Sequence, residues 1–302
     1  MTLPSAQSAG RASVDSMIRE WTRADTVAFL HAPTADDDKY SRGVVALRTG
    51  SRAYPGAAVL GVEAAWRAGA GYVRYSGGAA DAVLARRPET VAGSDIGRTR
   101  VGAWVIGSGT DAAHRDDDEL AALQEVLHRE TPVVVDAGAL DLAHGATAPL
   151  VLTPHAGELA RLRERLGLAS AGSGSSSAPS DDASSDQRVA EVVETAEKLG
   201  NVVVRKGTRT IIAAPGAQPI SVSNGPAWLA TAGTGDVLAA VIAALLAANP
   251  DRPHQETAAA AVWLHGHAGA RASGSVDGAI GHPIVALDVA EALSAAIGEL
   301  IA

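Results

Sequence analysis

A glycine-rich turn that ends in an aspartate is the strongest chemical signal in the sequence. The segment Gly-Thr-Gly-Asp at residues 233–236 directly precedes a long apolar run, VLAAVIAALLAA. Glycines at a helix start let backbone N–H groups approach an anion, and the helix dipole favours negative charge there. Asp236 can be a helix-capping carboxylate or a general base aimed at a hydroxyl, beside an anion hole for a transferred phosphoryl group. Asn224 and the Ala-Thr pair before the turn, with the helix after it, favour the general base.

Two further segments in the middle of the chain carry polar groups. Asp136 ends the apolar run TPVVVD; it is either a turn residue or a carboxylate at the edge where open α/β sheets bind ligands. Residues 206–210, Lys-Gly-Thr-Arg-Thr, fit a hairpin turn. The same five residues offer a cation, hydroxyls and backbone N–H groups, which suits a nucleotide phosphate.

A strand-to-helix junction contains the segment TPHAGE at residues 153–158. His155 can cap the helix, contact a substrate or lie at the surface. Glu158 can complement the helix dipole or help to organise magnesium and water. His265 and His267 do not form a credible metal site, because alternate positions on a helix point apart.

Strand and helix patterns alternate from Gly43 onward. Short apolar runs such as GVVALR, GYVRY and LVLTP indicate strands. Residues 56–68, 119–128 and 155–166 have apolar residues at helical spacing. The segment NVVVRKGTRTIIAAP predicts two strands around a turn, and the last third from Gly233 is mostly helical. This alternation predicts an α/β protein with a mostly parallel central sheet and helices on both faces.

Two segments interrupt this pattern. Residues up to about 38 are predicted to form a short helix from Val14 to Leu30 and a loop that ends in an acidic run. Residues 169–187 contain no aromatic residue, leucine, valine or cation, which predicts a flexible insertion. The insertion can alternatively be a linker between domains, but neither flank resembles a complete domain. We therefore expect a single domain over residues 1–302.

The composition restricts the partners and the chemistry. The 302 residues carry a net charge of −9, which disfavours nucleic acid and anionic membranes as partners. The absence of cysteine removes disulfides, thiolate nucleophiles and cysteine–zinc sites. No apolar run approaches the roughly 20 residues that span a bilayer, and the amino terminus lacks a signal-peptide pattern. A cytoplasmic protein without a membrane partner is expected.

Together the motifs resemble the ADP- or ATP-dependent NAD(P)H-hydrate dehydratases of the ribokinase-like superfamily. The turn at residues 233–236 resembles the anion-hole motif of that superfamily, TPHAGE matches the family's T-P-H-x-G-E, and residues 206–207 match its K-G turn. Further matches are KYSRG at 39–43, GS at 50–51, YPGAAVL at 54–60, RAGAG at 67–71, LHG at 264–266 and AG at 268–269. The resemblance covers about Lys39 to Leu300, apart from the insertion, and implies a ribokinase-like three-layer sandwich.

The resemblance also implies an activity, in which hydrated NADH or NADPH (the S epimer) is dehydrated by a lyase that consumes ADP or ATP with Mg²⁺. It implies a homotetramer and cooperation with a separate epimerase, because about forty leading residues are too few for the epimerase domain fused to some relatives. The residues that it assigns to catalysis are Gly233, Thr234, Gly235 and Asp236; to the substrate, Ala57, Gly109, His155 and Asp236; to the nucleotide, Lys206, Gly207, Thr208, Arg209, Thr210 and Gly235; and to magnesium, Glu158.

Two segments depart from the family pattern. The family's G-P-G-L-G is replaced by Gly-Ser-Gly-Thr at residues 107–110, and Gly138 stands where D-A-D-A-L has its second aspartate. The second change removes one carboxylate near the expected site. Two other functions stay open. A vitamin-precursor kinase of the same fold would leave a stable phosphorylated product, and a non-catalytic regulatory protein would bind nucleotide without turnover. The preferences for ADP or ATP and for NADH or NADPH hydrate also stay open.

Overall fold

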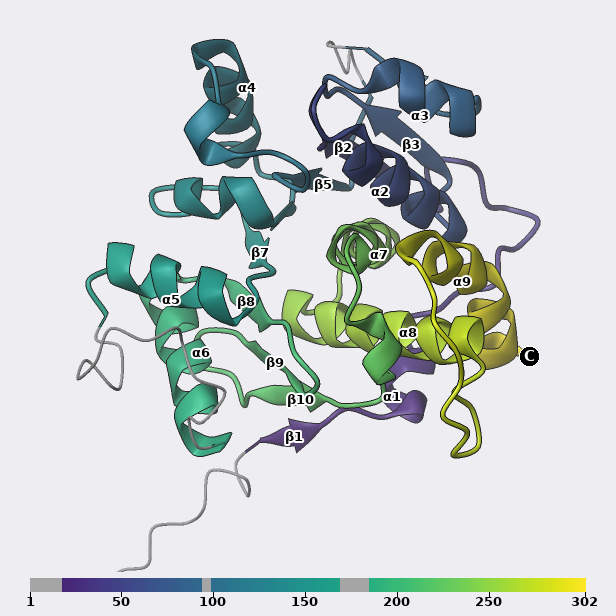
Figure 1. The fold of residues 1–302 in the computed structure, drawn as a ribbon. Helices are drawn as coiled ribbons and strands as arrows, with labels where there is room; N and C mark the ends of the chain where they lie inside the picture. The colour runs from purple at the N-terminus through teal and green to yellow at the C-terminus, as the bar shows by residue number, and fades with distance from the viewer. Residues whose placement is uncertain (1–17, 94–98, 169–184) are drawn as a thin grey trace, which may run out of the picture.

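The computed structural model describes residues 18–93, 99–168 and 185–302, and a large twisted sheet lies at the centre of this part of the chain (Figure 1). Ten strands pair in the order β1-β10-β9-β8-β7-β6-β5-β2-β3-β4. The strands are β1 (Arg19–Glu20), β2 (Val44–Arg48), β3 (Tyr72–Tyr75), β4 (Val91–Ala92), β5 (Ala103–Ile106), β6 (Val133–Val135), β7 (Leu150–Leu152), β8 (Val202–Arg205), β9 (Thr210–Ala213) and β10 (Ile220–Val222).

The sheet is parallel except around β9, which runs antiparallel to both β8 and β10. A turn as short as residues 206–209 can join only antiparallel neighbours, so the two predicted strands of NVVVRKGTRTIIAAP are confirmed. The other described pairs, from β8 across to β4 and between β1 and β10, are parallel. The predicted mostly parallel α/β sheet is therefore confirmed.

Helices cover both faces of the sheet. Figure 1 shows α4, α5 and α6 on one side and α2, α7, α8 and α9 on the other. The bounds are α1 (Arg23–Val27), α2 (Pro55–Arg67), α3 (Ala80–Arg86), α4 (Asp117–Leu127), α5 (Ala156–Arg165), α6 (Ser185–Leu199), α7 (Thr234–Ala248), α8 (His254–Ser273) and α9 (Ala286–Ile301), with short 3₁₀ turns η2 (Ala112–His114), η3 (Ala137–Leu142) and η4 (Ala227–Leu229). No helix in these ranges is both long and apolar enough to cross a membrane.

Alternation along the strands divides the interior into two cores. Val134 packs in the core that contains α2, α7, α8 and α9, whereas Val133 and Val135 pack in the core beneath α4, α5 and α6. Successive side chains of a strand point to opposite faces, so a run of valines in β6 serves both cores. Helix α7 is buried all round because the sheet and its neighbouring helices enclose it. The three-layer sandwich is confirmed.

The amino-terminal helix predicted over 14–30 is wrong within the described residues. Residues 19–20 form β1, which pairs with β10, and the helix begins only at Arg23. A reciprocal capping box fixes that start: Asp25 N–H donates to the Thr22 hydroxyl, and Thr22 N–H donates to the Asp25 carboxylate. Most of the predicted insertion, residues 169–184, lies outside the described residues. Residues 185–187 already belong to α6, so the predicted boundary extends too far.

A buried carboxylate joins α2 to the segment around α3. Glu63 has a fully buried side chain and accepts hydrogen bonds from Arg67 at 3.0 Å, Arg86 at 3.3 Å and also Arg87. Burial alone would raise the pKa of Glu63, but the hydrogen bonds from Arg87 and Arg67 outweigh it and hold the pKa below its usual range. The ionised form is thus the one that the fold stabilises.

Glu63→Gln is expected to lower the free energy of unfolding at pH 7 by about 3 kcal/mol, because three guanidinium groups lose the charge that they surround. The matched control is Glu125→Gln. The exposed Glu125 carboxylate pairs with Arg129 one turn away, so this variant should change stability by less than about 0.5 kcal/mol. Urea unfolding of both variants measures the difference. Because the folded pKa of Glu63 is depressed, its advantage should disappear as the pH falls through that pKa. Equal effects of the two variants would contradict the structural role of Glu63.

Candidate active site

Side chains from four neighbouring strands meet at one edge of the sheet. Ser108 follows β5, Asp136 follows β6, Thr153 follows β7 and Lys206 follows β8. All four strands are parallel, so these residues lie at the carboxyl edge, where open α/β sheets bind ligands. Helix α7 packs against the sheet (Figure 1). Asp236 in its first turn interacts electrostatically with Asp136 and Lys206, so α7 begins beside this edge.

Asp136 is the centre of this group. Its carboxylate is almost fully buried and accepts hydrogen bonds from the Ser108 hydroxyl at 2.9 Å and the Thr153 hydroxyl at 2.7 Å. The Lys206 ammonium group binds the same carboxylate at 2.7 Å. Three donors thus satisfy a buried charge that would otherwise be very costly. Ala137, the next residue, has a φ of 43° in the left-handed region that favours glycine, so the contacts of this turn hold a strained backbone.

Asp236 lies in the first turn of α7 with an altered proton affinity. Its pKa is raised to about 6, first by burial and then by the negative charge of Asp136, while Lys206 and the Ser108 hydroxyl act in the opposite direction. With such a pKa, about nine in ten Asp236 carboxylates are ionised at pH 7. A carboxylate whose pKa lies this close to neutrality is well suited to accept a proton.

The glycine turn ahead of Asp236 has a conformation that demands glycine. Gly233 has a φ of 91°, and a Cβ atom there would lie 2.7 Å from Leu60 and 2.9 Å from Ala286. Gly235 faces Lys206, whose Nζ atom lies 3.4 Å from the position that a Cβ would take. The first N–H groups of α7 therefore stand beside an ammonium group, an arrangement that suits a phosphate.

The two cationic side chains of the predicted nucleotide loop, residues 206–210, contact different parts of the protein. Lys206 reaches the carboxylate group, but the Arg209 guanidinium is directed to the hydroxyls of Ser185 at 3.0 Å and Ser221 at 3.4 Å. Thr210 begins β9 and donates its hydroxyl hydrogen to the Gly207 carbonyl at 3.1 Å. The loop thus contributes the Lys206 ammonium group to the edge of the sheet.

Two predicted substrate residues are in contact with each other. A Cβ atom at Gly109 would lie only 2.3 Å from the Ala57 Cβ atom, so α2 and the turn after β5 approach as closely as small residues allow. The two departures from the family pattern also meet, because a Cβ atom at Gly138 would lie 2.2 Å from the Thr110 carbonyl oxygen. The two departures are therefore linked, because the altered turn at 107–110 occupies the space that a side chain at position 138 would need.

His155 and Glu158 cap the amino terminus of α5. The His155 Nδ1 atom accepts from the N–H groups of Gly157 at 3.1 Å and Glu158 at 3.4 Å, and the Glu158 carboxylate accepts from His155 N–H at 2.8 Å. The capping interpretation of His155 is thus confirmed, and Glu158 lies in the first turn, where its charge complements the helix dipole. With Nδ1 as acceptor, the neutral ring carries its proton on Nε2, which lies 3.5 Å from the Glu158 Oε1 atom on a largely exposed side chain.

Sequence reasoning missed several members of the group. Ser108 and Thr153 were not assigned a role, although each follows a buried strand at the functional edge. His265 was dismissed only as a metal ligand, yet it is buried near Lys206, and burial lowers its pKa to about 4. Its Nε2 atom has no hydrogen-bond partner. No group of three or more His, Cys, Asp or Glu side chains within residues 18–93, 99–168 and 185–302 is placed to hold a metal ion.

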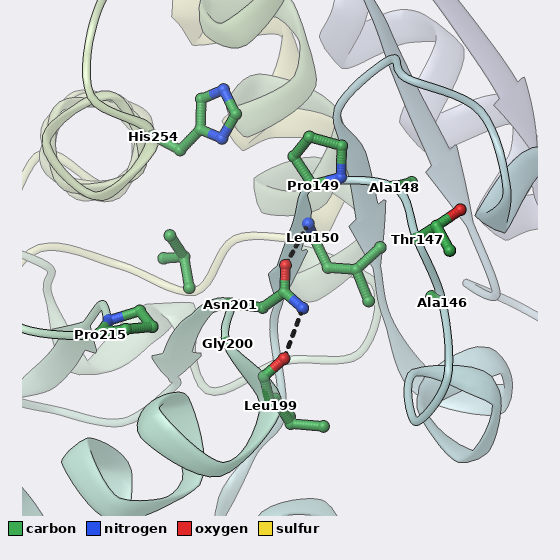
Figure 2. Close-up of a pocket in the computed structure, with 11 residues that line it drawn as sticks. Ala146, Thr147, Ala148, Pro149, Leu150, Leu199, Gly200, Asn201, Pro215 and His254 are labelled. Carbon is green, nitrogen blue, oxygen red and sulfur yellow. Dashed lines mark hydrogen bonds between the residues drawn. The ribbon is translucent and has the colours of Figure 1, made fainter.

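A cavity of about 460 Å³ at the opposite edge of the sheet does not share these features. Figure 2 shows Asn201 between the starts of β7 and β8, where it accepts from Leu150 N–H at 2.7 Å and donates to the Leu199 carbonyl at 2.9 Å. His254 is the titratable side chain in its lining, and burial lowers its pKa. The amide of Asn201 thus holds the two strand starts together, and the acid–base group lies elsewhere.

The arrangement is that of a ribokinase-like α/β protein, as solved structures confirm. A ribokinase-like superfamily protein from Enterococcus faecalis superimposes with a TM-score of 0.75 at 25% identity, over 94% of this chain and 96% of that one. The ADP/ATP-dependent NAD(P)H-hydrate dehydratase from Bacillus subtilis gives a TM-score of 0.75 at 24% identity, over 94% and 99% of the two chains. These likenesses establish the fold.

Comparison with sequence relatives assigns the chain to one family among the ribokinase-like proteins. The family model for NAD(P)H-hydrate dehydratase matches residues 45–278. The ADP-dependent (S)-NAD(P)H-hydrate dehydratase of Neisseria meningitidis is 36% identical over 78% of this chain and 79% of its own length. A bifunctional NAD(P)H-hydrate repair enzyme from Mycobacterium leprae is 41% identical over 85% of this chain, which spans about half (51%) of that relative. The chain belongs to the NAD(P)H-hydrate dehydratase family.

Asp136→Asn is expected to lower the pKa of Asp236 from about 6 towards the ordinary value of about 3.9. The substitution removes the nearby negative charge and leaves Lys206 free to stabilise the ionised form. Carbon-13 NMR of labelled aspartate carboxyl groups, with Asp236→Asn to assign the signal, measures the shift. A pKa that stays near 6 would show that burial alone sets the proton affinity of Asp236.

Proposed function

We propose that this protein dehydrates the S epimer of hydrated NADH or NADPH at the expense of ADP or ATP, as a lyase that repairs damaged cofactor. The observation that carries the proposal is Asp236, a carboxylate of raised pKa, beside the glycine turn of α7 and the Lys206 ammonium group. The name of the Neisseria relative, which acts on NAD(P)H hydrate with ADP, agrees with this chemistry. No other group on the carboxyl edge combines a base with an anion site in the described part of the chain.

The reaction needs a better leaving group than hydroxide. Hydration places a hydroxyl on carbon six of the nicotinamide ring and a hydrogen on the neighbouring carbon, and hydroxide leaves poorly because the pKa of water is about 15.7. Transfer of the terminal phosphoryl group of ADP to that hydroxyl gives AMP and a phosphate ester. The lone pair of the ring nitrogen then expels inorganic phosphate, and the neighbouring carbon loses its proton to restore the double bond.

Three parts of the site match the phosphoryl transfer. The Asp236 carboxylate accepts the hydroxyl proton as the oxygen attacks phosphorus. The N–H groups at Gly233, Thr234 and Gly235 bind the charge that develops on the phosphoryl oxygens, and Lys206 adds a cation. The carboxylate stands beside the anion hole, since a second negative charge among the phosphate oxygens would repel them. Residues 206–210 bind the nucleotide.

The substrate enters over the small residues next to this group. Ala57 and Gly109 pack closely against each other, and we expect the flat ring to lie over the surface that α2 and the turn after β5 form there. His155 offers an Nε2–H donor at the same edge. In this proposal the ring hydroxyl lies between Asp236 and the terminal phosphate.

Mg²⁺ enters the site with the nucleotide. Mg²⁺ keeps several waters and is usually held by one or two carboxylates and substrate phosphates, so a preformed group of protein ligands is not required. Glu158 would supply one carboxylate, whose Oε2 atom accepts from His155 N–H and whose Oε1 atom lies 3.5 Å from His155 Nε2. When bound, Mg²⁺ neutralises charge on the transferred phosphoryl group.

The second candidate is a vitamin-precursor kinase, because the same base and anion hole would phosphorylate any alcohol held there. A stable phosphorylated product would identify it, whereas the dehydratase releases inorganic phosphate. For the dehydratase we further propose a cytoplasmic homotetramer that works with an epimerase supplying the S epimer. The decisive assay follows the return of reduced-nicotinamide absorbance from hydrated NADH and Mg²⁺, with and without nucleotide; equal rates would exclude the proposal.

Asp236→Asn is expected to reduce turnover about 10²- to 10⁴-fold, because the amide keeps the shape of the side chain but cannot accept the proton. Nucleotide affinity by calorimetry should be retained. The melting temperature at pH 7 should stay equal or rise, since the raised folded pKa means that the ionised carboxylate destabilises the fold as the pH increases through about 6.

The matched control is Asp116→Asn, which alters the capping aspartate of α4, whose carboxylate accepts from Glu119 N–H at 2.8 Å. Asparagine is nearly as good a cap as aspartate, so this variant should keep its turnover. Near wild-type turnover of Asp236→Asn would eliminate Asp236 as the base.

A further inference from the structure

A cavity of about 690 Å³ opens beside the carboxyl edge of the sheet. Its walls come from the turn after β5, from η3 and from α5, which follow three neighbouring strands. The volume lies within the range of small-molecule sites in proteins. Its lining includes three acidic residues, Asp111, Asp141 and Glu158, and two arginines, Arg161 and Arg165.

Each wall of the cavity starts at the proposed active site. Thr110 follows Gly109, Ala137 follows Asp136, and Glu158 lies one helical turn after His155. A ligand held at the active site can therefore continue into the cavity without leaving the protein surface. The nucleotide loop follows β8, the neighbour of β7 in the sheet, and none of residues 206–210 lines the cavity.

The acidic residues of the cavity are already engaged. Asp111 accepts from His114 at 2.8 Å and from Ala113 N–H at 3.0 Å. Asp141 pairs with Arg115 at 2.8 Å. Glu158 caps α5 through His155. Their negative charge is thus partly compensated within the wall itself.

Two arginines of the cavity remain without such partners. Arg161 and Arg165 lie one turn apart on α5, and both are exposed. Within the described ranges neither makes a hydrogen bond or an ion pair. A pair of unpaired guanidinium groups four residues apart can bind one phosphate from two sides, because each offers a planar fork of donors. The two guanidinium groups are therefore the charged donors that this lining offers to a ligand.

We propose that Arg161 and Arg165 bind the 2′-phosphate on the adenosine half of hydrated NADPH, and so make this enzyme prefer NADPH hydrate to NADH hydrate. The inference rests on the proposed function of the neighbouring site. The two arginines lie about 9 and 15 Å along the helix from His155, at about 1.5 Å per residue. A dinucleotide spans such a distance, whereas the nicotinamide ring alone does not. The 2′-phosphate is the group that distinguishes the two substrates.

The test compares the full-length protein with Arg161→Ala/Arg165→Ala. In the variant, kcat/KM for NADPH hydrate should fall about 10- to 100-fold, as for the loss of charged hydrogen bonds, while the value for NADH hydrate stays within about twofold. Arg161→Lys/Arg165→Lys keeps the positive charge but lacks the planar fork of donors. Its kcat/KM for NADPH hydrate should lie between those of wild type and the double alanine variant. Lys198→Ala/Arg252→Ala removes two positive charges from the opposite edge and should change neither value.

Direct binding separates this inference from the proposed function. Calorimetry with NADPH and NADH as probes needs no turnover: wild type should bind NADPH more tightly, and the double alanine variant should lose the difference. Equal loss for both probes, or a raised KM for ADP alone, would overturn the assignment to the 2′-phosphate. If wild type discriminates between the probes as expected but restores no hydrate with nucleotide, the proposed function fails and the phosphate site stands.

Discussion

Two carboxylates and one ammonium group share the carboxyl edge of the sheet, and the chemistry of the site depends on that imbalance of charge. Lys206 binds Asp136 at 2.7 Å. Burial and the negative charge of Asp136 therefore dominate the proton affinity of Asp236, and its pKa rises to about 6. A phosphate that enters the glycine turn competes with Asp136 for the same ammonium group. Anion binding and the proton affinity of the base are therefore set by one group of charges.

The fold holds this group on rigid elements. Parallel strands end at a common edge, so the turns after β5, β6, β7 and β8 deliver Ser108, Asp136, Thr153 and Lys206 to one place. Asp236 arrives on α7, a helix that the sheet and three other helices enclose. Close packing resists displacement, which keeps the spacing of the charges constant. The cavity beside α5 lies outside this rigid group, where exposed side chains can adapt to the rest of a large substrate.

Much of this architecture could be predicted from the sequence, because its signals are local. The valine run before Asp136 indicated a buried strand, and the glycines before Asp236 indicated a helix start. The capping box of Thr22 and Asp25 is also a local signal, and it marks the start of α1 at Arg23 rather than at residue 14. Other features are not local: the hydrogen bond from Ser108 to Asp136 and the contact of Gly138 with Thr110 join residues 28 positions apart. Spacing along the sequence does not predict contacts between distant residues. The link between the two departures from the family pattern is therefore visible only in the structure.

The central claim is that the ring hydroxyl attacks phosphorus, and the fate of its oxygen tests this most directly. Hydrated NADH that carries oxygen-18 in the ring hydroxyl is incubated with the protein, ADP and Mg²⁺, and the released inorganic phosphate is analysed by mass spectrometry. If Asp236 deprotonates the hydroxyl for phosphoryl transfer, the carbon–oxygen bond breaks later and each phosphate contains one labelled oxygen. Label in water together with unlabelled phosphate would contradict the mechanism, because the hydroxyl would then have left without being phosphorylated.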